Sequence, residues 1–343
     1  MADFFTLPNK ERREALTFAA DASGRPIHLL EKDVWVVWSL QQVFTGSYAA
    51  HLVFKGGTSL SKAYKVIRRF SEDIDLTYDI REIAADLIRE SCSLLPPNKS
   101  QEKKWTKAIR ERLAEWVSNK MLPTLSTAIA QQKLSATAKA DGEKILIEYE
   151  ALATGTGYVK PTVTLEFGAR STGEPSELRD VVCDAAEQVP SITFPSARPM
   201  VMRPERTFWE KATAIHVFCA QGEFRGGDRF ARHWHDVTRL DVAGFTDKAI
   251  ADRNLAKNVA DHKNIFFTEK DGDGIVIDYV AAVSGGLRLV PTDGALAKLA
   301  ADYQHMVEDG LLLDDVESFD ALIAQCKAVQ EKANTPAPPL RPH

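Results

Sequence analysis

Two aspartates one residue apart, Asp73 and Asp75, have the types and spacing that could do chemistry in this chain. The segment from Asp73 to Tyr78 alternates polar and apolar residues, which is typical of a β-strand, and residues two apart on a strand share one face. The two carboxylates would lie about 7 Å apart and could hold Mg²⁺, which prefers oxygen ligands. Metal ions held in this way can bind the attacking and the leaving oxygen in an in-line displacement at phosphorus. The alternative is a solvated strand face, although acidic residues are uncommon in strands.

A glycine turn, Gly56-Gly57-Thr58-Ser59, precedes this strand and lies between a short apolar run and a helical pattern. Glycines let a ligand approach the backbone, and a helix N-terminus favours phosphate. The hydroxyls of Thr58 and Ser59 could donate to the same phosphate or could simply cap the helix. The spacing is not that of a Walker A loop. A phosphate turn followed by a metal strand is the order that nucleotidyl transfer needs.

These residues resemble the first two motifs of a known family. Residues 54–62 (FKGGTSLSK) and 69–76 (RFSEDIDL) look like motifs of the AbiEii/AbiGii nucleotidyltransferase toxins, which belong to bacterial toxin–antitoxin and abortive-infection pairs and include the MenT-like toxins. Residues 204–212, with Lys211, and residues 232–236, with Asp236, resemble later motifs of the family. Residues 31–33 (EKD) resemble a further recurrent segment.

The resemblance implies an α+β fold with a polymerase-β-like nucleotidyltransferase core and a helical C-terminal domain. It implies an NTP substrate, Mg²⁺ or Mn²⁺ held by Asp73 and Asp75, and a nucleotide site that includes Gly56, Gly57 and Lys211. It also implies an RNA acceptor, with the 3′ end of tRNA as the expected one, and a cognate antitoxin as partner.

Lys211 and Asp236 can also be judged from their spacing. On a helix, Lys211 lies at the edge of an apolar stripe with Phe208 and Ile215, so its ammonium either reaches solvent or meets an anion such as a phosphate. Asp236 follows Arg232 by four residues and could form a helical ion pair worth about 0.3–0.5 kcal/mol. The functional interpretation, in which Asp236 orients Lys211, the acceptor or the base, depends mainly on the resemblance.

A third carboxylate could complete the site. Glu166 lies on an alternating segment, residues 162–167, and could bind metal or act as general base on the acceptor hydroxyl. The alternative is an exposed strand residue, and Glu148 and Glu150 are weaker candidates.

The basic residues Lys62, Lys65, Arg68 and Arg69 follow the glycine turn. If the helix runs from Thr58 to Ile67, Lys62, Lys65 and Arg69 share one side and could bind a triphosphate or an RNA backbone. The alternative is a solvated helix face. A second basic cluster at residues 103–112 is interpreted as solvated.

The chain order predicts which elements position these residues. Hydrophobic periodicity predicts helices at 8–22, 28–46 and over most of 81–135, and strands at 51–55, 73–78, 143–150, 159–167 and 199–202. The loop 154–157 (TGTG) would join two strands of a hairpin. Further helices are expected at 204–220, 227–243, 247–262, 293–308 and 316–333.

This order predicts an α/β nucleotidyltransferase domain at residues 1–200 and a helical domain at 201–333 that closes the active-site cleft. The Pro-rich tail, residues 334–343, is expected to be disordered.

Composition limits the function classes. The net charge of −5 gives no general basic excess for nucleic acid, and four dispersed cysteines argue against a zinc cluster or a disulfide scaffold. No apolar run is long enough for a membrane span, and the N-terminus lacks a secretory pattern. We expect a cytoplasmic monomer that does not bind membranes.

The leading hypothesis is a toxin that transfers NMP from an NTP to RNA. The alternatives are a nucleotidyltransferase with a protein or small-molecule acceptor, and a non-catalytic NTP-binding module that acts through its partner.

Overall fold

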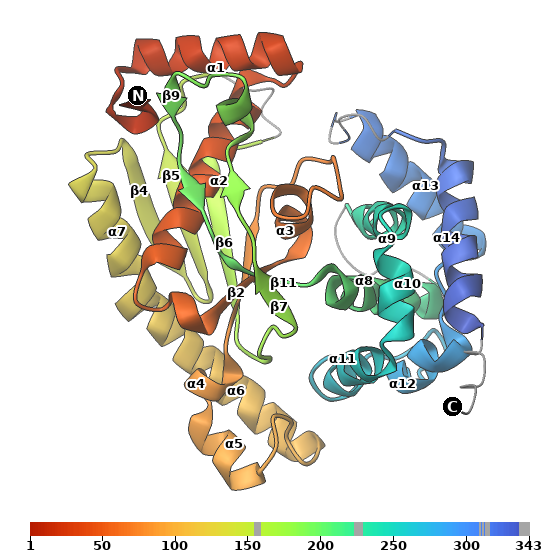
Figure 1. The fold of residues 1–343 in the computed structure, drawn as a ribbon. Coiled ribbons are helices and arrows are strands. Elements are labelled where there is room, and N and C mark those ends of the chain that lie inside the picture. The colour runs from red at the N-terminus through yellow and green to blue at the C-terminus, as the bar shows by residue number, and fades with distance from the viewer. Residues whose placement is uncertain (154–158, 223–228, 309, 311, 313–315, 336–343) are drawn as a thin grey trace, which may run out of the picture. The chain divides into compact units, whose positions relative to one another are not determined.

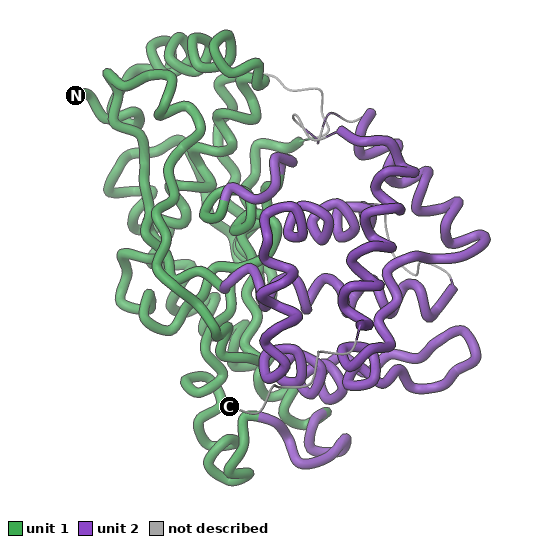
Figure 2. The backbone as a smooth tube through the Cα atoms, turned by 45° about the vertical axis from the view of Figure 1, so that its right-hand side comes forward, with its two compact units in different colours: residues 1–64, 71–94, 103–202 green, residues 65–70, 95–102, 203–343 purple. Residues whose placement is uncertain are grey.

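The computed structural model describes residues 1–153, 159–222, 229–308, 310, 312 and 316–335. They form two compact units, shown in Figure 2: residues 1–64, 71–94 and 103–202, and residues 65–70, 95–102 and 203–343. The loop expected at 154–157 and nearly all of the expected tail lie outside the described residues. No described helix is long and apolar enough to cross a membrane.

The first unit is built on a mixed sheet (Figure 1). Its strand order is β4-β5-β6-β3-β2-β11-β7, in which β3 is parallel to β6 and antiparallel to β2. The strands are β2 (Leu52–Lys55), β3 (Ile74–Tyr78), β4 (Ala136–Asp141), β5 (Lys144–Tyr149), β6 (Thr162–Gly168), β7 (Ser176–Leu178) and β11 (Met200–Met202). Two small pairs join β1 (Ala2–Asp3) to β9 (Ile192–Thr193) and β8 (Val181–Val182) to β10 (Ser196–Ala197).

One face of this sheet is apolar and is covered by helices. Strand alternation buries Ile74 and Leu76 of β3 completely, together with the in-register Leu165 of β6. On the same face Trp35 stacks on Tyr149 with ring centroids 5.0 Å apart. The opposite face of β3 and β6 therefore carries the polar residues of these strands.

The helices of the first half have the expected positions, with one exception at the glycine turn. Helices α1 (Asn9–Ser23) and α2 (Ile27–Thr45) match the predicted ranges, and the helical stretch after β3 comprises α4 (Ile80–Ile83), α5 (Ala85–Ser91), α6 (Lys99–Trp116) and α7 (Leu122–Gln131). Helix α3 (Gly56–Lys62) ends five residues before the expected end at Ile67. Because Lys65 has a left-handed φ of 54°, the helix cannot continue, and the expected common side for Lys62, Lys65 and Arg69 is wrong.

The second unit is largely helical. Its helices are α8 (Pro204–Gln221), α9 (Arg232–Val242), α10 (Phe245–Ala251), α11 (Arg253–Phe266), α12 (Tyr279–Ala281), α13 (Asp293–Glu308) and α14 (Phe319–Asn334). The expected single helix at 247–262 is two helices, because Asp252 leaves the helical conformation and accepts a hydrogen bond from the Leu255 amide as an N-cap. The expected α+β fold with a helical C-terminal region is confirmed.

Substitutions at two leucines of the same sheet test how much the burial of β3, the strand that contains Asp75, stabilises the protein. Leu76 is fully buried, whereas Leu178 on β7 is 53% exposed. We expect Leu76→Ala to lower the free energy of unfolding in a urea titration by about 2–5 kcal/mol, because it leaves a cavity. Leu178→Ala should change the free energy by no more than about 0.5 kcal/mol. Equal effects of the two substitutions would contradict the buried face described for β3.

Candidate active site

Asp75 lies on the polar face of the sheet, between charged residues of both neighbouring strands. It pairs in register with Lys55 of β2 and with Glu166 of β6. Because residues in register on adjacent strands point the same way, the Glu166 side chain lies beside that of Asp75. Asp73 immediately precedes the strand. The structure therefore places two of the carboxylates predicted from the sequence, Asp73 and Asp75, at the start of β3, and the third, Glu166, on the neighbouring strand β6.

Glu166 is engaged by a lysine of the adjacent strand. Its carboxylate pairs with the Lys144 ammonium at 2.5 Å, and both side chains are partly exposed. The hydrogen bond from Lys144 to Glu166 raises the pKa of Lys144, and the negative charges of Glu166 and Asp73 raise it further. Lys144 is therefore influenced by two of the three carboxylates, Glu166 and Asp73. The weaker candidate Glu148 pairs instead with Lys139 at 2.8 Å.

Gly56 is required by its contact with Asp75. The residue has a φ of +80°, and a Cβ added there would come within 2.8 Å of the Asp75 Cγ and would overlap the carboxylate oxygen. Only glycine tolerates both the backbone conformation and the close approach. The turn therefore sets bare backbone directly against one of the two predicted metal-binding carboxylates.

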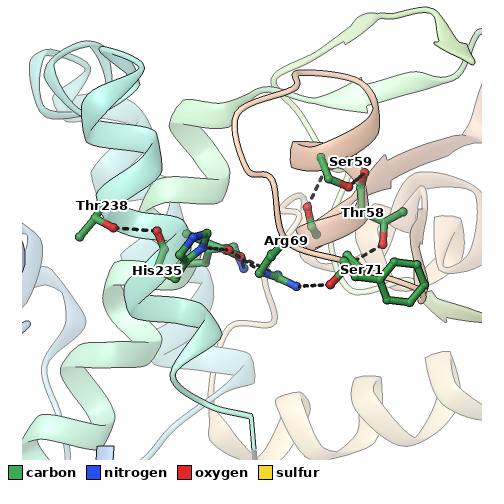
Figure 3. Close-up of polar contacts among 11 residues, drawn as sticks. Thr58, Ser59, Arg69, Ser71, His235 and Thr238 are labelled. Atoms are coloured by element: carbon green, nitrogen blue, oxygen red, sulfur yellow. Dashed lines mark hydrogen bonds and ion pairs between the residues drawn. The ribbon is translucent and has the colours of Figure 1, made fainter. Parts of the chain in front are cut away.

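The hydroxyls of the turn hold the protein's own backbone. The fully buried Thr58 donates from Oγ1 to the Asp73 carbonyl at 2.5 Å, and the Ser71 hydroxyl lies 2.9 Å from the same Oγ1 (Figure 3). Ser59 donates to the Gly56 carbonyl at 2.9 Å. Since a hydroxyl carries one proton, Thr58 uses its proton on the residue that leads into β3, and Ser71 donates to Thr58. Thr58 therefore positions Asp73.

Lys62, expected at the nucleotide, is part of a buried ion-pair group. Its ammonium lies 2.6 Å from a carboxylate oxygen of Asp33 on α2 and 2.6 Å from one of Asp184. Asp184 also pairs with Arg25. Burial raises the pKa of Asp33, while the charge of Lys62 opposes that effect. These contacts fix the C-terminal end of α3 to α2.

In the second unit, Asp236 brings together two cations from distant parts of the sequence. Its carboxylate accepts two hydrogen bonds from Arg69, at 2.7 and 2.8 Å, and lies 2.8 Å from the Lys211 ammonium of α8. Figure 3 shows Arg69 directed toward α9, the helix that also carries His235 and Thr238. Asp236 is fully buried, Arg69 is 6% exposed and Lys211 is 8% exposed. Arg69 and Lys211 thus share the Asp236 carboxylate.

The positive neighbours of Asp236 control its ionisation. Burial by itself would raise the pKa of Asp236, but the charges of Arg69 and Lys211 and the hydrogen bonds from Arg69 hold this pKa well below its usual range. Burial also keeps the pKa of His233 well below its usual range, and the nearby Lys211 adds to the effect. Asp236 is therefore an anion and His233 is neutral at neutral pH.

The donor chemistry at β3 fits a divalent metal ion. Asp73 and Asp75 supply the oxygen ligands that Mg²⁺ prefers, and the absence of a side chain at Gly56 makes room for the Asp75 carboxylate itself. Within the described residues no group of three or more histidine, cysteine, aspartate or glutamate side chains is arranged to hold a metal. An ion held by Asp73 and Asp75 would share its remaining ligands with substrate phosphates.

Two roles could not be assigned from the sequence. The sequence predicts Arg69 as a possible phosphate ligand, and the structure shows it paired with Asp236. Lys32 on α2 had no assigned role, and it pairs with Glu72, the residue before Asp73. The signal for Lys32 was three consecutive charged residues, 31–33, in an otherwise apolar helix.

Removing the Asp236 carboxylate should destabilise the protein strongly. Asp236→Ala leaves Arg69 and Lys211 buried without their shared anion, which costs about 3–5 kcal/mol of unfolding free energy. Asp241 on the same helix is a matched control, because its ion pair with Lys332 is partly exposed and worth at most about 1 kcal/mol. Urea titrations compare the two variants, and equal unfolding midpoints would contradict the buried ion-pair group.

A comparison of the sequence with known protein families gives a match over most of the chain. The family described as "Nucleotidyl transferase AbiEii toxin, Type IV TA system" matches residues 38–325. This range contains the glycine turn, the carboxylate strand, Lys211 and Asp236. No curated protein sequence matches the chain.

Two solved structures are similar over most of the chain. The nucleotidyltransferase toxin MenT4 from Mycobacterium tuberculosis is 16% identical, with 93% of this chain and 97% of that chain covered and a TM-score of 0.39. The protein JHP933 from Helicobacter pylori is 14% identical, with 88% of this chain and 89% of that chain covered and a TM-score of 0.38. The sequence match over most of its length shows that the chain belongs to the AbiEii family of nucleotidyltransferase toxins of type IV toxin–antitoxin systems.

Proposed function

We propose that this nucleotidyltransferase transfers NMP from an NTP to an RNA acceptor, with the 3′ end of tRNA as the expected acceptor, and that Mg²⁺ or Mn²⁺ is required. The observation that carries the proposal is the Asp75 carboxylate, which lies against the bare backbone of Gly56 and beside Glu166, with Asp73 directly before the same strand. Oxygen ligands of this kind suit a metal ion that is shared with a triphosphate.

In this proposal Asp73 and Asp75 hold the metal ion, which when bound would neutralise the charge of the phosphates. Gly56 provides backbone that the phosphates can approach. Gly57, Thr58 and Ser59 are buried and maintain the shape of the turn. The acceptor hydroxyl attacks the α-phosphorus, the bond from that phosphorus to the bridging oxygen breaks, and pyrophosphate leaves. The hydroxyl proton passes to a base, for which Glu166 is the candidate once Lys144 releases it.

Lys211 contributes positive charge for the triphosphate, and Asp236 orients its ammonium. The contact between the two side chains supports this role, because the Lys211 ammonium lies 2.8 Å from the Asp236 carboxylate, which also accepts hydrogen bonds from Arg69. Lys62 has no part in this scheme, since its ammonium is held by Asp33 and Asp184. A cognate antitoxin, as expected for the family, would limit the activity in the cytoplasm.

Direct labelling tests the reaction. The purified protein is incubated with each α-³²P-labelled NTP, Mg²⁺ and total bacterial RNA, beside an Asp73→Ala/Asp75→Ala variant. We expect a labelled tRNA band that is absent with the variant, and weaker labelling as salt increases, since RNA binding releases counterions. Labelled protein without labelled RNA would support a protein acceptor. NTP binding with no labelled product would support a non-catalytic module and contradict the proposal.

Gly56→Ala should abolish transfer although the protein still folds. The added methyl group overlaps the Asp75 carboxylate and pushes it from its place beside the turn. Gly24→Ala is the matched control, because Gly24 also has a positive φ, of +71°, with nothing within 4 Å of the added Cβ. Both variants carry a backbone strain of about 1–2 kcal/mol.

The loss of labelling with Gly56→Ala should exceed 100-fold, which corresponds to about 2.7 kcal/mol of transition-state free energy. Gly24→Ala should label at close to the wild-type rate when both proteins are folded by circular dichroism. Similar labelling by the two variants would show that the Gly56–Asp75 contact is not needed for the reaction.

A further inference from the structure

Helix α2 buries three consecutive charged residues, and each of them holds a different segment of the first unit. Glu31, Lys32 and Asp33 are 2%, 3% and 7% exposed. The Glu31 carboxylate accepts the Leu152 amide at 2.9 and 3.0 Å. Asp33 holds Lys62 at the end of α3. The segment held by Lys32 is the one that leads to the carboxylates.

Lys32 joins the starts of two neighbouring strands. Its ammonium pairs with the Glu72 carboxylate and donates to the Lys160 carbonyl at 3.0 Å. Glu72 directly precedes Asp73, and Lys160 lies shortly before the first residue of β6. Strands β3 and β6 are parallel neighbours, so one ammonium is bound where both of them begin.

The register of these strands makes their starting points important for the site. Asp75 and Glu166 lie side by side because Ile74 is aligned with Leu165. A shift of one strand by a single residue would turn its side chains to the other face. The Thr58 hydroxyl holds the Asp73 carbonyl from one side, and Lys32 holds the preceding residue through Glu72.

The energetics indicate that this buried ion pair serves geometry more than stability. Taking an ammonium and a carboxylate out of water costs several kcal/mol per ion, and an apolar side chain of similar volume is often as stable. Glu72 is 20% exposed at its side chain, whereas that of Lys32 is 3% exposed, so most of the desolvation falls on the lysine. An apolar residue at position 32 could not form the ion pair with Glu72 or the hydrogen bond to the Lys160 carbonyl.

We infer that Lys32 is a positioning residue of the reaction, which fixes the Asp73–Asp75 segment relative to Glu166 through Glu72 and the Lys160 carbonyl. The inference rests on the proposed function, because it assigns Lys32 a role through the carboxylates of that site.

Hydrogen exchange measured by mass spectrometry tests the positioning directly. Lys32→Met keeps an apolar stem of similar length and removes the ammonium. We expect faster deuterium uptake, by several-fold, in peptides that cover residues 71–78 and 160–168, while peptides from the second unit exchange as in the wild type. Lys32→Arg, whose guanidinium can reach the same acceptors, should restore slow exchange in both peptides.

Glu31→Gln is the matched control on the same helix. The Glu31 side chain is as buried as that of Lys32 and accepts a hydrogen bond from the Leu152 amide. The effect of Glu31→Gln on exchange should therefore appear around residue 152 and not in the peptide 71–78. If Lys32→Met fails to fold, Glu72→Gln breaks the same ion pair from its more exposed side and keeps the side-chain volume.

Nucleotidyl transfer is measured on the same proteins. We expect Lys32→Met to lower kcat at least 10-fold, to change the KM for the NTP less than threefold and to raise the Mn²⁺ concentration needed for half-maximal labelling. Lys32→Arg should recover most of the rate. Glu31→Gln should keep the wild-type Mn²⁺ dependence, even where its stability is lower.

Three results would overturn the inference: unchanged exchange in both peptides, faster exchange with an unchanged rate of transfer, or uniformly faster exchange throughout the protein. The Asp73→Ala/Asp75→Ala variant separates this failure from that of the proposed function. If that variant loses transfer while Lys32→Met behaves as the wild type, the function stands and the role of Lys32 fails. If the aspartate variant retains transfer, the proposed function itself fails.

Discussion

A charge removed from water must meet an opposite charge. The arrangement of two buried charged groups in this protein, the one on α2 and the one around Asp236, depends on that constraint. On α2, Lys32 and Asp33 lie among fully buried apolar residues and are tolerated because Glu72 and Lys62 reach them. In the second unit, Asp236 is tolerated because two cations share it. Each of these contacts joins segments that are far apart in the sequence, so pairing the charges also fixes the elements.

Most of the fold could be predicted from hydrophobic periodicity. The alternation of β3 and β6 is strong because one face is apolar, and the predicted ranges of α1 and α2 agree with the structure. Strand β4 was missed because its alternating residues are small or charged (ATAKAD), so its pattern carries little hydrophobic contrast. The break between α10 and α11 was missed because the N-cap role of Asp252 does not interrupt the helical period.

The candidate site could be predicted only where local spacing defines it. Asp73, Asp75 and the glycine turn follow from strand and turn geometry over about twenty residues. The partners of the charged residues could not be predicted, because Arg69 and Asp236 are 167 residues apart and Lys62 and Asp184 are 122 residues apart. Lys62 and Thr58 have the residue types expected at a phosphate. Only the tertiary structure shows that one is held by two aspartates and the other by a backbone carbonyl.

The difference in burial between the aspartates determines what each can reveal about the reaction. Asp236 is fully buried between two cations, so an uncharged substitution removes charge from the interior and changes folding and transfer together. Asp75 is only half-buried on the polar face of the sheet, where its loss leaves no cavity in the apolar core. A lost activity at Asp75 therefore reports on chemistry, whereas a lost activity at Asp236 does so only after the folded fraction is known. The same reasoning separates Gly56 from Lys32: Gly56 acts by direct contact with a carboxylate, and Lys32 acts through the residue that precedes one.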